Sequence, residues 1–190
     1  MKVGLFFGSF NPIHIGHLII ANHIQQYTDL QKVWFVISPH NPLKKKSTLA
    51  NGSDRLHLVN LAIEDYPNLS TSSIEFNLPQ PSYTIDTLTV LKEKYPDYDF
   101  SIIMGMDNLD SFEKWKNYEQ ILKQYSIYVY PRIGSEPGKW ENHPKITLTA
   151  APIIEISSTF IRQALKEKKN IRPLLPEKVW NYLEGSSMYS

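Results

Sequence analysis

Two histidines in a turn-rich segment are the residues of this chain best placed to do chemistry. His14 and His17 lie three positions apart within Gly8-Ser9-Phe10-Asn11-Pro12-Ile13-His14-Ile15-Gly16-His17. That spacing turns both side chains to the same face of a helical turn, and the free N–H groups at a helix start attract anions. The pair therefore predicts an anion site, above all for phosphate groups.

The elements around this segment must position it. The apolar run at 3–7 predicts a buried first strand, and residues 18–24 predict a helix. The histidines thus follow the carboxyl end of a strand, which is where open parallel sheets bind ligands. Gly8 permits a close approach of the backbone to a ligand.

Two later segments could supply further phosphate contacts. Lys44-Lys45-Lys46 follows a strand predicted at 32–37, and Ser157-Ser158-Thr159-Phe160-Ile161-Arg162 opens a helix with Ser157 or Ser158 as its N-cap. Taken singly, the lysines suit a solvated loop, the serines an ordinary cap and Arg162 a surface charge. Taken together, they would place cations, an arginine fork and a second helix start around one polyphosphate.

Several classes of function are excluded by what the sequence lacks. It contains neither a G-x-G-x-x-G after the first strand nor a G-x-x-x-x-G-K-[ST], which argues against a common dinucleotide site and a P-loop kinase. It has no cysteine, so disulfides, thiolate zinc sites and a thiol nucleophile are excluded.

Charge and hydropathy narrow the class of partner. The formal net charge of +1 and the lack of a basic stripe with interleaved aromatics argue against nucleic acid. No apolar run is long enough to span a membrane, and Met1-Lys2-Val3 leads directly into a strand. We expect a cytoplasmic protein without a membrane partner, and the oligomeric state, a homo-oligomer included, stays open.

Alternating strands and helices predict an α/β fold: a Rossmann-like open parallel sheet with helices on both faces. Further strands are expected at 73–76, 100–105 and 126–130, with short extended pieces at 146–148 and 153–156. Helices are expected at 54–64, from Ser82, around 115–122, from 157 and at 177–183, with a surface loop at 131–144. The whole chain, 1–190, reads as one domain with a C-terminal helical segment at about 157–185.

The segment from Phe7 to His17 resembles the signature of the nucleotidylyltransferase superfamily, which shares the H-x-G-H element with class I aminoacyl-tRNA synthetases. Four later segments narrow the resemblance to bacterial nicotinate-nucleotide adenylyltransferases: Tyr83-Thr84-Ile85-Asp86-Thr87-Leu88, Gly105-Met106-Asp107 with Trp115, Ile156 to Arg162, and Arg172-Pro173-Leu174-Leu175-Pro176. The likeness covers essentially the whole chain.

This resemblance implies that AMP moves from ATP to nicotinate mononucleotide in NAD biosynthesis, with Mg²⁺ held mainly by phosphates and no protein metal ligands. Its catalytic residues would be His14, His17 and Arg162, with His17 nearest the α-phosphate. The residues it implies around ATP are Gly8, Ser9, Phe10, His14, Gly16, His17, Lys44, Lys45, Gly105, Asp107, Ile156, Ser157, Ser158 and Arg162.

For the nicotinate nucleotide the resemblance implies Tyr83, Thr84, Trp115 and Lys116. The indole of Trp115 would stack on the pyridine, and backbone N–H groups near Thr84 would hold its carboxylate. On spacing alone Trp115 suits a core position equally well, and Asp107 suits an ordinary helix cap.

The chain departs from the family pattern in two places. The family usually has Gly-Gly-Thr-Phe-Asp-Pro, whereas Phe7 replaces the first glycine here and Asn11 replaces the aspartate. The family's second loop usually reads Pro-Pro-His-Lys, whereas this chain has Pro42-Leu43-Lys44-Lys45. The positive charge is kept, so either Lys44 or Lys45 could reach the phosphates.

Three alternative functions remain open at this stage. The same fold could serve another acceptor, either nicotinamide mononucleotide or phosphopantetheine. It could also form a non-catalytic nucleotide-binding protein, which would release no pyrophosphate from ATP.

Overall fold

The fold is built on one parallel sheet, described here from a computed structural model that covers residues 1–39 and 49–189. Six strands within those ranges follow the order β3-β2-β1-β4-β5-β6, and every neighbouring pair is parallel. The strands are β1 (Lys2–Gly8), β2 (Lys32–Ile37), β3 (Leu69–Ser72), β4 (Asp99–Gly105), β5 (Ser126–Tyr130) and β6 (Ile146–Leu148). The strand order reverses between β1 and β4, and ligands bind at the carboxyl ends beside such a reversal.

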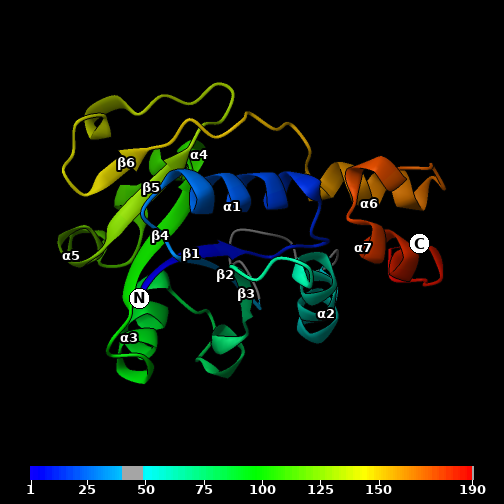
Figure 1. The fold of residues 1–190 in the computed structure, drawn as a ribbon, viewed down its shortest axis with the longest axis horizontal. Coiled ribbons are helices and arrows are strands. Elements are labelled where there is room, and N and C mark those ends of the chain that lie inside the picture. Colours follow the sequence, from blue (N-terminus) through cyan, green and yellow to red (C-terminus); the bar gives the residue numbers. More distant parts are fainter. Residues whose placement is uncertain (40–48, 190) are drawn as a thin grey trace.

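Helices cover both faces of the sheet (Figure 1), because successive strand residues point to opposite sides. On β1, Phe6 joins a core with helices α1, α2, α6 and α7, whereas Val3 and Leu5 join a second core with α3 and α5. The helices are α1 (Ile15–Tyr27), α2 (Gly52–Ile63), α3 (Thr84–Lys94), α4 (Met106–Leu109), α5 (Tyr118–Gln124), α6 (Ser158–Lys166) and α7 (Glu177–Glu184).

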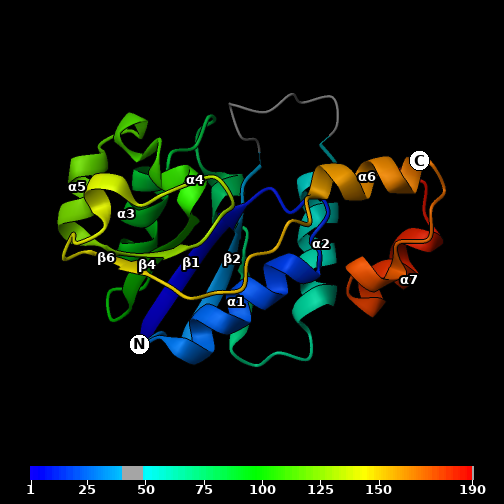
Figure 2. The same cartoon turned by 90° about the horizontal axis from the view of Figure 1, so that it is seen from above.

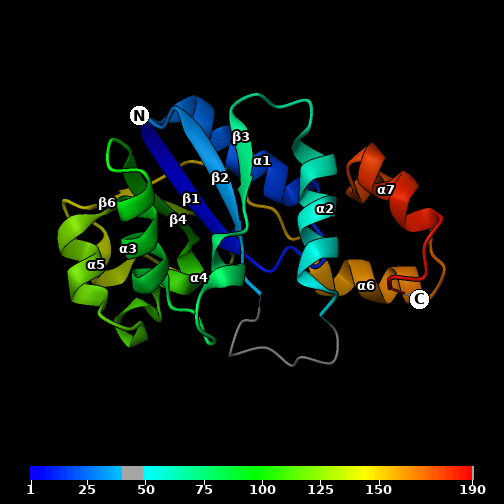
Figure 3. The same ribbon diagram turned by 90° about the horizontal axis from the view of Figure 1, so that it is seen from below.

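Figure 2 shows α1 lying over the strands, and Figure 3 shows α3 and α5 on the opposite side. Short 3₁₀ segments complete the regular structure at η2 (Ile74–Asn77), η3 (Phe112–Lys114), η4 (Gly138–Trp140) and η5 (Arg172–Leu174). No helix in the described part of the chain is both long and apolar enough to cross a bilayer.

Four local expectations from the sequence are wrong. The expected strand at 73–76 is the 3₁₀ segment η2, and the strand itself is the polar Leu69–Ser72, which pairs only with β2 at the edge of the sheet. The helix expected from Ser82 begins at Thr84, with Tyr83 as its N-cap. The helix expected around 115–122 begins at Tyr118, because Asn117 is left-handed (φ 54°). Residues 153–156 join no strand.

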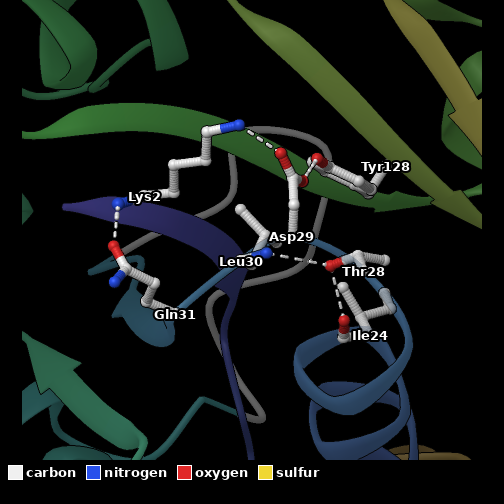
Figure 4. A network of polar contacts seen from close by, with 7 residues as sticks. All are labelled: Lys2, Ile24, Thr28, Asp29, Leu30, Gln31 and Tyr128. Atoms are coloured by element: carbon white, nitrogen blue, oxygen red, sulfur yellow. Dashed lines mark hydrogen bonds and ion pairs between the residues drawn. The ribbon is translucent and has the colours of Figure 1, made fainter.

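Asp29 ties the end of α1 to the sheet (Figure 4). Its carboxylate accepts hydrogen bonds from the Lys2 ammonium group on β1 and from the Tyr128 hydroxyl on β5. Thr28 closes the helix by donating from Oγ1 to the carbonyl of Ile24 at 2.6 Å. The start of β1 and the end of α1 are thereby fixed to each other, away from the histidine segment at the other end of both elements.

Removing the Tyr128 hydroxyl tests this tie. We expect Tyr128→Phe to lower the free energy of unfolding by about 0.5–1.5 kcal/mol, the usual net value of one hydrogen bond, since the buried ring still fills its space. Urea unfolding followed by circular dichroism measures the difference. The matched control is Tyr27→Phe, whose side chain is 78% exposed and should change nothing. Equal stabilities for Tyr128→Phe and the unaltered protein would contradict the expectation.

Candidate active site

His14 and His17 open α1 directly after the loop that leaves β1. His14 is the N-cap in an extended conformation, and its backbone N–H donates to Nδ1 of His17 at 3.2 Å. The two imidazole rings stack, with centroids 3.7 Å apart and planes 26° apart. Because Nδ1 of His17 accepts this bond, the neutral ring carries its proton on Nε2, which is then a donor.

His14 is a neutral imidazole at physiological pH. Its side chain is buried, and this burial together with the positive charge of Arg132 lowers the pKa of His14 to about 4. Its Nδ1 has no hydrogen-bond partner among the described residues, and the same is true of Nε of Arg132. Buried polar atoms without a hydrogen bond are rare and call for an explanation. Both atoms belong to the same region at the carboxyl end of the sheet.

The loop between β1 and α1 is shaped by Phe10. This residue is left-handed (φ 44°), which is costly for a side chain of its size. Its ring is buried and meets the His17 ring edge-on, with centroids 5.1 Å apart. Phe10 therefore supports His17 from the core side. Gly8 makes room for it, since a Cβ there would lie 2.7 Å from the Phe10 ring.

Gly16 is required for a similar reason. A Cβ at this position would lie 2.8 Å from Cγ2 of Ile154 and 3.1 Å from Nδ1 of His14. The segment leading to α6 can therefore cross the start of α1 only over a glycine. Ile156, one of the residues expected at the ATP site, lies in that same segment and packs against the core.

Helix α6 docks on the histidine loop. Ser157 caps it by accepting the Phe160 N–H at 3.2 Å, so the first of the two caps left open by the sequence is the one used. Ser158 donates from Oγ to the carbonyl of Pro12 at 2.9 Å, and Arg162 donates from Nη1 to the carbonyl of Asn11 at 2.7 Å. The structure thus brings Ser158 and Arg162 to the loop that carries the histidines.

Arg55 clamps the same loop from inside and was missed by the sequence analysis. Its side chain is fully buried on α2. All its hydrogen bonds in the described structure go to backbone carbonyls: Ser9 at 2.6 Å, Ser38 at 2.8 Å, Ala50 at 3.0 Å and Pro39 at 3.1 Å. Burial lowers the pKa of Arg55, although a guanidinium group stays charged in proteins.

Asp107 and Arg132 form a further part of the candidate site, at the carboxyl ends of β4 and β5. Asp107 is the second residue of the short helix α4, and its Oδ1 lies 3.6 Å from Nε of Arg132. A Cβ at Gly105 would lie 2.4 Å from that carboxylate oxygen, so a larger residue there would displace the Asp107 side chain. Arg132 was missed because residues 131–144 were interpreted as a surface loop only. The rule that found the histidines, a polar residue just after a central strand, applies to it equally.

The residues expected at the nicotinate end gather at the start of α3. Lys116 forms an ion pair with Asp86 at 2.9 Å, and its Nζ lies 4.7 Å from the centre of the Tyr83 ring. Thr84 is the first residue of the helix. Trp115, next to Lys116, packs against Phe112 with ring centroids 5.5 Å apart. The four expected residues therefore come from two adjacent segments.

Buried Glu75 holds this helix start to η2. Its carboxylate accepts hydrogen bonds from Thr87 at 2.8 Å and from Ser82 at 3.2 Å. Burial raises the pKa of Glu75, and the hydroxyl groups partly offset that effect. Glu75 was not predicted from the sequence, although an acidic side chain between the apolar Ile74 and Phe76 is an available signal.

Two of the residues expected to contact the ATP phosphates, Lys44 and Lys45, fall outside the described residues. The described residues contain no group of three or more His, Asp or Glu side chains that could hold a metal ion. Ser9 takes part through its carbonyl, which accepts from Arg55.

Comparisons with known proteins place this geometry in context. A family model described as cytidylyltransferase-like matches residues 5–164. Over its full length the chain is 61% identical to a probable nicotinate-nucleotide adenylyltransferase from Flavobacterium psychrophilum, of which it covers 99%. It is 51% identical, again over its full length, to a protein of the same description from Cytophaga hutchinsonii, of which it also covers 99%.

Solved structures share the fold. The nicotinic acid mononucleotide adenylyltransferase of Plasmodium falciparum, complexed with NaAD, matches with a TM-score of 0.82 and 20% identity, over 99% of this chain and 97% of that one. A putative nicotinate-nucleotide adenylyltransferase from Vibrio parahaemolyticus matches with a TM-score of 0.74 and 24% identity, over 99% and 94%. The predicted Rossmann-like α/β fold is confirmed.

The lowered pKa of His14 predicts a loss of stability in mild acid. The unfolded chain binds a proton at His14 near pH 6.5, whereas the folded protein binds it only near pH 4. Between these values the unfolded state holds the extra proton, so stability falls as the pH falls, by up to about 3 kcal/mol from this group. Urea unfolding at pH 7 and pH 4.5 measures the loss.

His14→Gln removes this titration and should make the loss between the two pH values smaller. His23→Gln, a change of the same kind on the same helix, is the matched control and should keep the loss of the unaltered protein. An identical loss in His14→Gln would contradict the assignment of a buried, neutral His14.

Proposed function

Since the chain belongs to the nicotinate-nucleotide adenylyltransferase family, we propose that the histidine site transfers AMP from ATP to nicotinate mononucleotide. The products are nicotinate adenine dinucleotide and pyrophosphate, in NAD biosynthesis. The observation that carries the assignment of the site is the stacked pair of His14 and His17 at the start of α1, with Arg162 anchored to the same loop.

The reaction needs no general base. An oxygen of the nicotinate mononucleotide phosphate, already ionised at neutral pH, forms a bond to the α-phosphorus of ATP. The bond from that phosphorus to the bridging oxygen breaks, and pyrophosphate leaves with the electron pair. Catalysis then depends on aligning two polyanions and stabilising charge on the leaving group, for which fixed donors and cations are suited.

The two kinds of group at the site have different roles in this proposal. His14 is neutral because its pKa is about 4, so its imidazole does not act as a cation. His17 offers Nε2–H to the α-phosphate. Positive charge comes from Arg162 and Arg132, and Lys44 or Lys45 adds to it. Ser158, at the start of α6, lies where the triphosphate end would reach.

Mg²⁺ is proposed to arrive with ATP. The donors around the histidines are neutral or cationic, which suits phosphate oxygens and leaves the metal to be coordinated by phosphate and water, as Mg²⁺ prefers. Bound there, the metal would neutralise charge on the phosphates. Asp107 is the one carboxylate of the described site near these groups, and it is paired with Arg132.

The start of α3 is proposed to hold the nicotinate carboxylate. Its first N–H groups have no acceptor inside the helix and carry the positive end of the helix dipole. Lys116 neutralises Asp86, which would otherwise repel a second carboxylate at this point. Trp115 would stack on the pyridine ring. Because both substrates are metabolites of the cytoplasm, we also propose a cytoplasmic location.

Replacing His17 tests the catalytic assignment. We expect His17→Ala to lower kcat about 100-fold, the scale of losing one preorganised donor, while KM for ATP changes much less. Pyrophosphate release from ATP and nicotinate mononucleotide measures both constants. His23→Ala, on the same helix, is the control and should be unaffected. A near-normal kcat in His17→Ala would refute the role of His17.

Acceptor preference tests the other end of the site. The unaltered protein should use nicotinate mononucleotide with a higher kcat/KM than nicotinamide mononucleotide, because a neutral amide cannot form charge-assisted bonds with the helix start. Lys116→Gln should narrow that preference about threefold to tenfold, since Asp86 then loses its partner.

The control for this experiment is Lys114→Gln, which removes the same charge from an exposed position two residues away. Equal kcat/KM values for the two acceptors in the unaltered protein would overturn the proposed preference. Phosphopantetheine completes the acceptor panel. Activity with phosphopantetheine alone, or no pyrophosphate with any acceptor, would replace the proposed function by one of its alternatives.

A further inference from the structure

Tyr189 reaches the histidine loop from the other end of the chain. It lies in the turn that follows α7, and its hydroxyl donates to Oδ1 of Asn11 at 2.9 Å, across 178 positions of sequence. The ring is half-buried and packs against the core shared by α1, α2, α6 and α7. In Figures 2 and 3 the red segment after α7 lies beside α6.

Asn11 is the point where three distant segments meet the loop. Its Oδ1 also accepts the backbone N–H of Ala50, just before α2, at 3.1 Å. Its carbonyl accepts Nη1 of Arg162, on α6, at 2.7 Å. The Tyr189 hydroxyl thus binds the residue that also fixes Arg162.

The Tyr189 hydroxyl is buried near two guanidinium groups. The charges of Arg55 and Arg162 both act on its hydroxyl, while burial raises its pKa, so the group stays a neutral donor. A neutral donor at this point can bind Asn11 without drawing Arg162 into an ion pair. Arg162 therefore keeps its charge available for an anion.

The loop needs such support, because Phe10, next to Asn11, holds a left-handed conformation that L side chains adopt at a cost. A strained conformation persists only where the surroundings impose it. Arg55 fixes one side of the strained residue, at the carbonyl of Ser9, and Asn11 fixes the other side.

We propose that Tyr189 is a positioning residue for the phosphate site: through Asn11 it holds the loop from Gly8 to His14, and with it Arg162, in the conformation that receives ATP. This inference rests on the proposed function for its kinetic consequences. Its structural part, that the Tyr189 hydroxyl orders the loop, can be measured without any substrate.

The test variant is Tyr189→Phe, which removes only the hydroxyl and keeps the packed ring. KM for ATP should rise about threefold to tenfold, the range set by one hydrogen bond, while KM for nicotinate mononucleotide changes less. Hydrogen exchange of peptides that cover residues 8–14 should become faster in the free protein. Tyr182→Phe, which alters a 40% exposed tyrosine of α7 whose ring meets that of His57 on α2, is the matched control.

A double-mutant cycle with Asn11→Ala separates positioning from general stability. If the two side chains act as one unit, the double variant should raise KM for ATP no further than Asn11→Ala alone. Thermal unfolding of every variant shows whether it is folded at the assay temperature. Additive effects of the two substitutions would overturn the proposal.

The proposal is equally overturned if Tyr189→Phe keeps the KM for ATP and the loop exchange of the unaltered protein. A loss of activity that follows the loss of folded protein at constant KM also overturns it. If the unaltered protein releases no pyrophosphate from ATP and nicotinate mononucleotide, the proposed function fails by itself. The exchange measurement then still decides whether Tyr189 orders the loop.

Discussion

The buried guanidinium group of Arg55 is the interaction on which the rest of the site depends. A charge inside a protein is costly unless it is fully hydrogen-bonded, and here four backbone carbonyls surround it. Those carbonyls belong to the ends of β1 and β2 and to the start of α2. In a trans peptide the carbonyl and the next N–H point in opposite directions, so binding the Ser9 carbonyl turns the Phe10 N–H away from Arg55. The clamp therefore fixes both the path of the loop and the direction of its donor.

The charge of the whole molecule says little about this site. The formal net charge is +1, yet Arg132 acts on His14, and Arg162 and the buried Arg55 both bind the loop that carries the histidines. Burial, together with the charge of Arg132, keeps His14 neutral. Positive potential is thus concentrated where the strands end, and the neutral imidazole of His14 adds no further repulsion between cations. A polyanion would meet fixed charges and fixed N–H groups at the same place.

The fold could be predicted from the sequence wherever burial leaves a pattern. The bounds of β2 and β5 match the expected ones, because both strands are covered by helices and read as apolar runs. β3 was missed since an edge strand can be polar, as Leu69–Ser72 is. Arg55 was missed for a different reason. Its side chain lies on the face of α2 that also carries Leu58 and Val59, but a lone arginine in a sequence does not reveal the carbonyls that will surround it.

The same limit applies to Asn11, which the resemblance identified only as a departure from the usual aspartate. In the folded chain its Oδ1 accepts hydrogen bonds from the Ala50 N–H and from the Tyr189 hydroxyl. An amide oxygen thus accepts the two hydrogen bonds that a carboxylate oxygen could also accept at this position. An aspartate would add a negative charge close to Arg162, where it would compete with a phosphate for that cation. Asparagine keeps both hydrogen bonds and leaves Arg162 uncompensated. The departure from the family pattern therefore favours anion binding at this loop.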